Sequence, residues 1–218
     1  MNLYFGRCSG NSSRAVFGLE ESGVAYERSL IDTRRGEHRT PGYLAINPMG
    51  KIPAFSDGPY RLWESNAINW YVAESHPESR LLPQTPQGRA SVQRWLFFQA
   101  AHVTQACQPI FRNTNQRVRE FWKPGPVDEA ALERGRNELA RYLPVLEQAL
   151  AGGPWLEGDF SLAEVALAPH LYLVHEGGHD FAPHPHVHDW LQRIWARPAW
   201  RRTVALVFDE GGPHHELP

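Results

Sequence analysis

Glu64 and Ser65 lie where a predicted strand ends and a predicted helix begins. At such a junction a serine hydroxyl, free backbone N–H groups and the positive end of the helix dipole all favour a bound anion. The Glu64 carboxylate beside them suits an ammonium group. The pair therefore suits a ligand that carries both groups, although Ser65 would also be explained as a plain helix cap.

The segment Asn47–Phe55, which reads NPMGKIPAF, places Pro53 at the start of a predicted strand. Proline has no backbone N–H, so within a sheet it costs a ladder hydrogen bond unless the strand lies at an edge. An ordinary edge-strand proline is therefore one interpretation of Pro53. Lys51 also stands out in this segment, because the only other lysine of the chain is Lys123.

Histidines gather in the last quarter of the chain, at His175, His179, His184, His186, His188, His214 and His215. This region is rich in glycine and proline, lacks an HExxH motif and has no acidic partner at a metal-ligand spacing. A surface loop is therefore favoured over a metal site. Cys8 and Cys107 show no CxxC or zinc-type spacing, so neither a disulfide scaffold nor structural zinc is expected.

Short strands and helices alternate up to about residue 76. The pattern predicts strands at 2–5, 25–31, 52–55 and 60–63, and helices at 12–22, 41–46 and 65–74. The turn SDGP at 56–59 joins the last two strands as an antiparallel hairpin. The first module is therefore a β-α-β unit followed by α-β-β-α, which is a mixed sheet with helices on its faces.

A proline-rich segment at 77–87 lacks periodicity and predicts a linker between one domain at 1–76 and another at 88–218. Beyond it, apolar residues recur every three or four positions. They predict helices at 89–111, 128–150, 161–174 and 187–195, and a short one after Pro198. Ser161 and Glu164 have the spacing of a capping box. The second domain is therefore expected to be all-α.

The composition fits a chain of two modest domains. Its 218 residues are 42% hydrophobic, and 8 Trp and 10 Phe provide bulky core side chains. The formal net charge of −2 indicates neither nucleic acid nor a membrane surface as a partner. The sequence shows no signal-peptide pattern and no stretch near the ~20 apolar residues of a membrane span, so we expect a soluble, cytoplasmic protein.

Taken together, these motifs resemble the cytosolic glutathione S-transferase family. The resemblance rests on NPMGKIPAF, on ESNAI at 64–68, and on RRGEH at 34–38, LLP at 81–83 and GDFSLA at 158–163. The SGNSxR pattern at 9–14 is similar to bacterial, theta-like members of the serine type. The resemblance implies an α/β plus all-α fold, with a thioredoxin-like domain (β-α-β-α-β-β-α) followed by a helical bundle domain.

In this family the N-terminal domain binds glutathione, and its binding residues are carried over here by motif position. The resemblance implies that Pro53 is cis and that it presents the backbone of Ile52 to the cysteinyl part of glutathione, like an added strand. Glu64 and Ser65 would hold the γ-glutamyl end. The basic residues matched to the glycyl carboxylate are His38 and Lys51.

The same resemblance matches Ser9 to the sulfur of glutathione. Its hydroxyl and the N–H groups at the helix start would stabilise the thiolate and lower the thiol pKa from ~8.5 towards neutral. Asn11 is an alternative for this contact, and Ser12 is a further one that would also be explained as a helix cap. Cys8 is an alternative of another kind, because some members use a cysteine in this loop for disulfide exchange. A core position would also explain it.

The second domain is expected to supply the wall for a small hydrophobic electrophile. Candidates on its long first helix, each of which core packing would also explain, are Trp95, Phe98, His102 and Phe111. Gln93, by motif position, would reach the ligand of the other subunit in a homodimer.

The resemblance implies an enzyme that conjugates its co-substrate glutathione to that electrophile, with peroxide reduction as a side activity. One alternative is a disulfide-exchange oxidoreductase that uses Cys8, and another is a non-catalytic binding module. No metal, nucleic acid or membrane partner is expected. The identity of the electrophile depends on side chains from several helices, so the sequence leaves it open.

Overall fold

The computed structural model describes residues 1–123 and 125–209, which divide into two compact units. The first unit contains Met1–Leu82 and the described residues from Pro198 on, and the second contains Pro83–Arg197. The last helix therefore packs with the first unit, although it follows the second in sequence. The domains expected from the sequence are continuous ranges, whereas these units are defined by contacts and the first is not continuous in sequence. The expected domain limits therefore stay a prediction.

The first unit is built on a four-stranded mixed sheet with the strand order β2-β1-β3-β4. Its strands are β1 (Asn2–Phe5), β2 (Glu27–Leu30), β3 (Ala54–Asp57) and β4 (Tyr60–Trp63). β1 is parallel to β2 and antiparallel to β3, and β3 is antiparallel to β4. Helix α1 (Gly10–Ser22) connects the parallel pair. The predicted β-α-β unit and the predicted hairpin are both confirmed.

The alternative interpretation of Pro53 as an ordinary edge-strand proline is wrong. β3 pairs with β1 on one side and with β4 on the other, so it is a central strand. The proline nevertheless costs no ladder hydrogen bond, because β3 begins one residue later, at Ala54. The Ile52–Pro53 peptide bond is cis, as the family resemblance implies.

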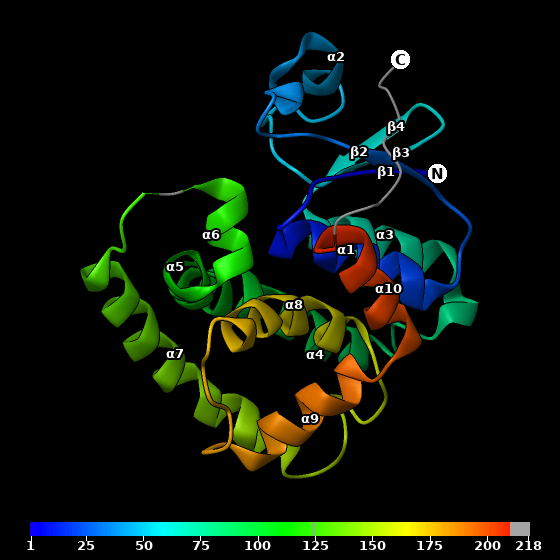
Figure 1. Ribbon diagram of the computed structural model, residues 1–218. Coiled ribbons are helices and arrows are strands. Elements are labelled where there is room, and N and C mark those ends of the chain that lie inside the picture. Colours follow the sequence, from blue (N-terminus) through cyan, green and yellow to red (C-terminus); the bar gives the residue numbers. More distant parts are fainter. Residues whose placement is uncertain (124, 210–218) are drawn as a thin grey trace. The chain divides into compact units, whose positions relative to one another are not determined.

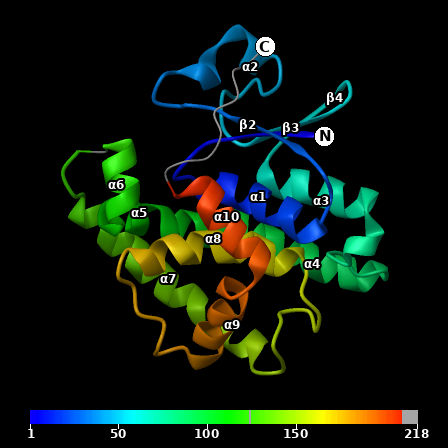
Figure 2. The ribbon, with the colours of Figure 1, turned by 45° about the vertical axis from the view of Figure 1, so that its right-hand side comes forward.

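Helices lie on both sides of this sheet (Figure 1). α1 and α3 (Ser65–Ser75) share one side, and the short α2 (Pro41–Leu44) lies on the other. α10 (Pro198–Val207) runs beside α1 (Figure 2), where the rings of Phe17 and Trp200 meet edge to face with centroids 5.1 Å apart. Two short 3-10 helices, Glu37–Arg39 and Pro77–Ser79, complete the described part of the unit.

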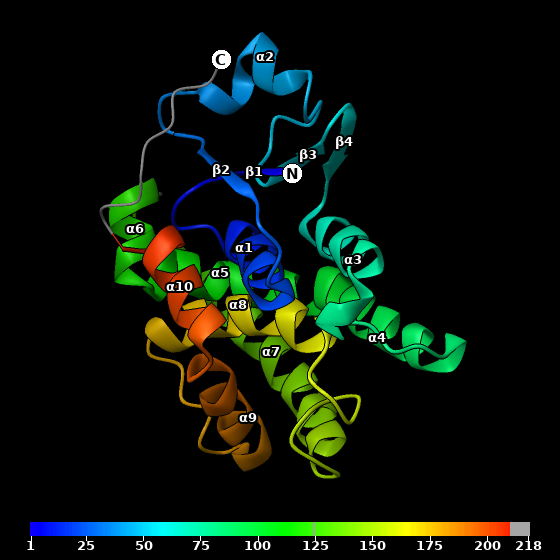
Figure 3. The ribbon, with the colours of Figure 1, turned by 90° about the vertical axis from the view of Figure 1, so that its right-hand side faces the viewer.

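The second unit is all-α, as expected (Figure 3). Its helices are α4 (Pro86–Phe98), α5 (Thr104–Thr114), α6 (Gln116–Trp122), α7 (Glu129–Leu150), α8 (Leu162–Glu176) and α9 (Pro185–Trp195). The helix predicted at 89–111 is confirmed as a continuous helical stretch, but a π-helical turn at Gln99–Val103 separates its α-helical parts α4 and α5. α6 is missing from the prediction, since its seven residues give too few repeats of the apolar period.

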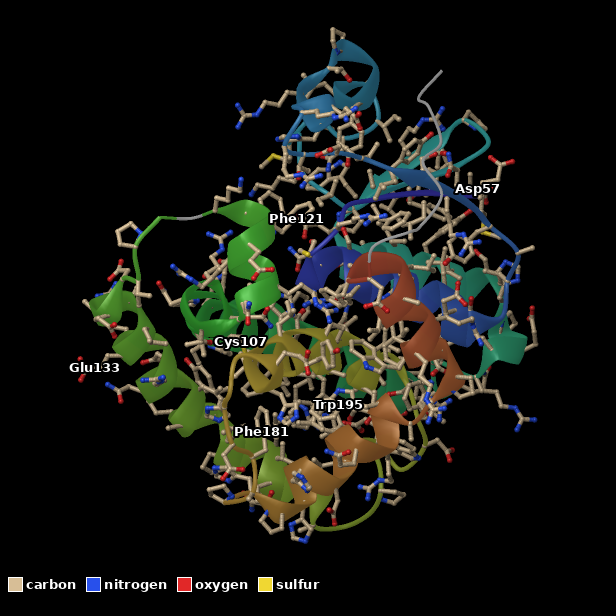
Figure 4. The ribbon with its side chains drawn as sticks, viewed as in Figure 1. Asp57, Cys107, Phe121, Glu133, Phe181 and Trp195 are labelled. Atoms are coloured by element: carbon tan, nitrogen blue, oxygen red, sulfur yellow. The ribbon has the colours of Figure 1, made fainter. Side chains whose placement is uncertain are left out.

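The core of the second unit centres on α8. All its residues from Leu162 to Leu171 are buried, and the predicted capping box of Ser161 and Glu164 at its start is confirmed. Cys107 of α5 is also fully buried, in agreement with a core role (Figure 4). Across residues 1–123 and 125–209, none of the helices combines the length and the apolar character that crossing a bilayer requires.

Gly135 allows α7 to approach α5 closely. A Cβ at this position would lie 2.8 Å from the carbonyl oxygen of Ala106 and 3.1 Å from Cγ1 of Ile110. Gly135→Ala is therefore expected to lower the free energy of unfolding by about 1–3 kcal/mol, measured by chemical denaturation, because the helices must move apart. The control is Gly152→Ala, since a Cβ there meets nothing within 4 Å. Equal stability of the two variants would contradict the close approach.

Candidate functional site

Ser9 is the N-cap of α1. Its Oγ accepts a hydrogen bond from the backbone N–H of Ser12 at 3.2 Å, so its own hydrogen is available for donation. The side chain is partly exposed, and the helix dipole places positive potential at the same point. Ser9 therefore offers a hydrogen-bond donor to an anion. Ser9 and not Ser12 is therefore the residue that caps this helix.

Ser12 and Asn11 differ in what they leave for a ligand. Ser12 is fully buried, and its Oγ accepts a hydrogen bond from the backbone N–H of Gly6 at 3.0 Å. Asn11 is exposed, and its Oδ1 accepts a hydrogen bond from Nη1 of Arg14 at 2.9 Å. The amide Nδ2 of Asn11 is therefore the group that remains for a ligand.

Cys8 precedes Ser9 but has a different environment. Only 6% of its surface is exposed, and its backbone is left-handed, with φ of 50°. Its N–H donates to the carbonyl oxygen of Val207 in α10 at 3.0 Å. Reactive cysteines are commonly accessible, whereas buried ones are inert. The geometry therefore favours a structural role for Cys8 over a redox role.

The backbone of Ile52 is open to a partner. Among the described residues, no hydrogen bond reaches its N–H or its C=O. The preceding carbonyl, that of Lys51, accepts hydrogen bonds from the Tyr43 hydroxyl and from Nδ2 of Asn47, both at 2.6 Å. Burial raises the pKa of the Tyr43 phenol, so the phenol stays protonated and donates. A Cβ at Gly6 would overlap Cδ1 of Ile52, so the open peptide lies beside the turn that leads into α1.

Glu64 is the N-cap residue of α3, but its side chain is exposed and caps nothing. Its backbone has φ of 70°, which turns the chain sharply into the helix. Ser65 follows as the first helical residue and is 4% exposed, and its Oγ accepts a hydrogen bond from Nη1 of Arg14 at 2.8 Å. The interpretation of Ser65 as a plain cap is therefore wrong. The Ser65 O–H remains for an anion at the helix end, and the Glu64 carboxylate remains for a cation.

Gly50, which precedes Lys51 and has φ of 58°, lies against the backbone of His38. A Cβ at Gly50 would lie 3.2 Å from the carbonyl oxygen of His38. Burial lowers the pKa of His38, and the charge of Arg39 lowers it further, so the imidazole is neutral at pH 7. Its Nδ1 is buried without a partner among the described residues, which leaves Nε2 for a ligand. Positive charge for a carboxylate therefore comes from the exposed Lys51.

The residues expected to face an electrophile do not form one group. Phe98 and His102 contact each other and the ring of Tyr142 in α7, with centroids 5.3 to 5.7 Å apart. Trp95 joins this group only through Phe98, with centroids 5.6 Å apart. Phe111 lies apart, because it is buried and packs against His170 of α8 at 5.8 Å. Trp95 is buried as well, so Phe98 and His102 are the members that keep exposed surface. Gln93 of α4 is exposed, and its role toward a second subunit stays a prediction.

Within the described ranges, the histidine-rich region gathers no group of three metal-ligating side chains. His175 packs instead against the rings of Trp195 and Phe181, with centroids 4.7 and 6.3 Å apart. The backbone N–H of His186 donates to Glu147 of α7 at 3.1 Å, which fixes the start of α9. His214 and His215 lie outside the described residues.

Arg14 and Asn47 hold the site together, although sequence reasoning gave neither a role. Arg14 donates to both Asn11 and Ser65, and Asn47 fixes the carbonyl that precedes the open Ile52 peptide. One signal was present for Arg14, because it is the only charged residue in the apolar and small stretch 12–19.

Comparisons with known proteins indicate one family. The model of the Glutathione S-transferase, N-terminal domain, matches residues 1–74, and that of the C-terminal domain matches residues 129–193. Glutathione S-transferase F9 of Arabidopsis thaliana is 37% identical over 198 residues, which are 88% of this chain and 91% of the relative. Glutathione S-transferase F10 of the same plant is 38% identical, over 89% of this chain and 92% of the relative.

A solved structure gives the same result. The theta class glutathione S-transferase from Xanthomonas axonopodis pv. citri, solved with glutathione bound, superposes with a TM-score of 0.83 and 30% identity. The aligned part covers 93% of this chain and 96% of that one.

Proposed function

The chain belongs to the glutathione S-transferase family, and on that premise we propose that it binds glutathione in the first unit and conjugates it to a small hydrophobic electrophile. The thiolate of glutathione attacks an electrophilic carbon and forms a C–S bond. The leaving group departs with its bonding electrons, and the thiol proton passes to solvent. The task of the chain is to orient the tripeptide and to keep its thiol ionised.

The Ser9 hydroxyl at the start of α1 carries the proposal. It accepts from the Ser12 N–H, and so it holds a hydrogen that it can donate to sulfur. This donor and the positive helix end favour the thiolate over the thiol, whose ordinary pKa is about 8.5. The thiolate is the nucleophile, so a larger ionised fraction at neutral pH means faster conjugation. This is the basis for proposing a serine-type enzyme.

The other open groups of the first unit suit the rest of glutathione. The Ile52 peptide would pair with the cysteinyl backbone as an added strand does. Ser65 and the N-terminus of α3 would hold the γ-glutamyl carboxylate, and Glu64 its ammonium group. Lys51 would supply the charge for the glycyl carboxylate, and neutral His38 one hydrogen bond. In the second unit, the exposed surfaces of Phe98 and His102 are the proposed contacts for the electrophile, because apolar rings suit a hydrophobic ligand.

The proposal predicts that the full chain is retained on immobilised glutathione and conjugates a generic aryl halide. Addition of glutathione at pH 7 is expected to produce the ultraviolet absorbance of a bound thiolate. A panel of electrophiles would then define the second substrate. Binding without thiolate or conjugation would favour a non-catalytic binding module, and absence of binding would contradict the proposal.

A separate assay tests disulfide exchange. The burial of Cys8 speaks against this activity. If glutathione-dependent disulfide reduction is the main activity and is lost in Cys8→Ala, the chain is an oxidoreductase and not a transferase.

A further inference from the structure

Arg14 connects two groups that the proposed function uses separately. Its Nη1 donates to Oδ1 of Asn11 at 2.9 Å and to Oγ of Ser65 at 2.8 Å. Asn11 lies beside Ser9, at the end proposed for the sulfur, whereas Ser65 lies at the end proposed for the γ-glutamyl group. The Arg14 side chain is 3% exposed. A single buried cation therefore holds a side chain from each end of the site.

The chemistry of the guanidinium group fixes the direction of these hydrogen bonds. Arginine donates and has no acceptor, so each partner must use an oxygen lone pair to bind it. Ser65 then keeps its O–H, and the amide of Asn11 is oriented so that Nδ2 remains. Among the described residues, neither of these remaining donors has a hydrogen-bond partner. Arg14 thus leaves both residues as donors, which is the form that a carboxylate and a thiolate require.

The charge and the fixed position of Arg14 strengthen this effect. A hydrogen bond from an ionised donor is stronger than a neutral one, and it polarises the hydroxyl that accepts it. The Ser65 O–H is therefore a better donor than an ordinary serine. The backbone of Arg14 is also held, because its carbonyl accepts a hydrogen bond from Nδ2 of Asn69 in α3 at 2.9 Å. Gly18 of α1 leaves the space that Asn69 occupies.

We propose that Arg14 is a positioning residue for glutathione, an inference that rests on the proposed function. It orients Ser65 toward the γ-glutamyl carboxylate and Asn11 toward the sulfur, and it does so without touching the ligand. Through this shared donor, the two ends of the site are coupled.

Arg14→Met and Arg14→Lys test the proposal through KM for glutathione and through the pKa of the bound thiol, titrated by its thiolate absorbance. Arg14→Met is expected to raise KM about tenfold and to move the thiol pKa towards about 8.5, because two charge-assisted hydrogen bonds are lost. Arg14→Lys is expected to lie between this variant and the wild type, since a point charge lacks the planar fork of donors. Unchanged KM and thiol pKa in both variants would overturn the proposal.

The control is Arg202→Met. Arg202 of α10 donates from Nε to Glu20 of α1 at 2.6 Å. Its substitution therefore removes an arginine hydrogen bond to α1, the helix of Arg14, at a place away from the site. This variant is expected to change stability but neither KM nor the thiol pKa. If the wild-type protein does not bind glutathione, the proposed function is wrong. If the wild type binds glutathione but the Arg14 variants behave like it, only the role of Arg14 is wrong.

A double-mutant cycle keeps the test valid if Arg14→Met does not fold. The cycle measures Arg14→Lys again in a protein that already carries Asn11→Ala and Ser65→Ala. There it is expected to change KM by less than about twofold and the thiol pKa by less than about 0.3, because the partners of Arg14 are gone. The same effect of Arg14→Lys in both backgrounds would overturn the proposal, since Arg14 would then not act through these partners.

Discussion

Ser9→Ala is expected to lower kcat/KM for glutathione conjugation about 10²- to 10³-fold at pH 7, because the thiolate loses the donor aimed at its charge. KM for glutathione is expected to change little, since the groups proposed for the tripeptide backbone and carboxylates remain. The deficit should shrink as the pH rises above about 8.5, where the thiol ionises without assistance. A pH profile of kcat/KM for both proteins measures this.

The loss of a helix cap must be separated from the loss of the sulfur contact. Ser9→Ala removes the cap of α1, which costs about 1 kcal/mol of stability. Thr85→Ala removes an equivalent hydroxyl cap from α4, where Thr85 accepts from the Gly88 N–H at 3.1 Å. It is expected to lose similar stability with no change in the pH profile.

Two further variants assign the sulfur contact. Cys8→Ala is expected to retain conjugation, and Asn11→Ala to lose less activity than Ser9→Ala. The opposite order for Asn11 and Ser9 would transfer the role to Asn11. A wild-type pH profile in Ser9→Ala would rule Ser9 out.

Local signals explain why much of the first unit was predictable. The turn at Gly58 that joins β3 and β4, and the junction of Glu64 and Ser65, depend on neighbours in sequence. The residues that form these features therefore specify them directly. The position of β3 within the sheet is not local, because it depends on which distant strand pairs beside it. For that reason the sequence left an edge strand after Pro53 open, and the structure shows a central one.

The features that escaped prediction depend on three-dimensional surroundings. The π-helical turn at Gln99–Val103 contains neither glycine nor proline that would indicate a break. Partial burial lowers the pKa of His38, and no sequence pattern reports the surroundings of a single histidine. Arg14 has the residue type of a surface group, but contacts with α3 place it inside. Its partner Asn11 is 3 residues away in sequence, whereas Ser65 is 51 residues away. Only the packing of α1 on α3 brings all three residues together.

Glu164→Ala is expected to lower the free energy of unfolding by at least about 3 kcal/mol, because three buried donors lose their acceptor at about 1–3 kcal/mol each. Glu164 is fully buried. Its Oε1 accepts from the Leu156 N–H at 2.8 Å, and its Oε2 accepts from the N–H and the hydroxyl of Ser161 at 2.9 and 3.0 Å. Burial raises the pKa of the carboxyl, while the hydrogen bonds from Leu156 and Ser161 oppose the rise. Chemical denaturation measures the loss.

Two variants show whether the acceptor or the carboxyl group as such matters. Glu133→Ala removes an exposed carboxylate from α7 (Figure 4) and is expected to change stability by less than about 0.5 kcal/mol. Glu164→Gln keeps one oxygen but turns an amide N–H₂ toward a donor, so an intermediate loss is expected. Full stability of Glu164→Ala would mean that the Leu156 and Ser161 donors find other acceptors. The groups proposed to bind glutathione lie in the first unit, so the folded fraction of Glu164→Ala should still bind it with unchanged affinity. A defect in stability without a defect in binding would identify Glu164 as a residue of the scaffold and not of the site.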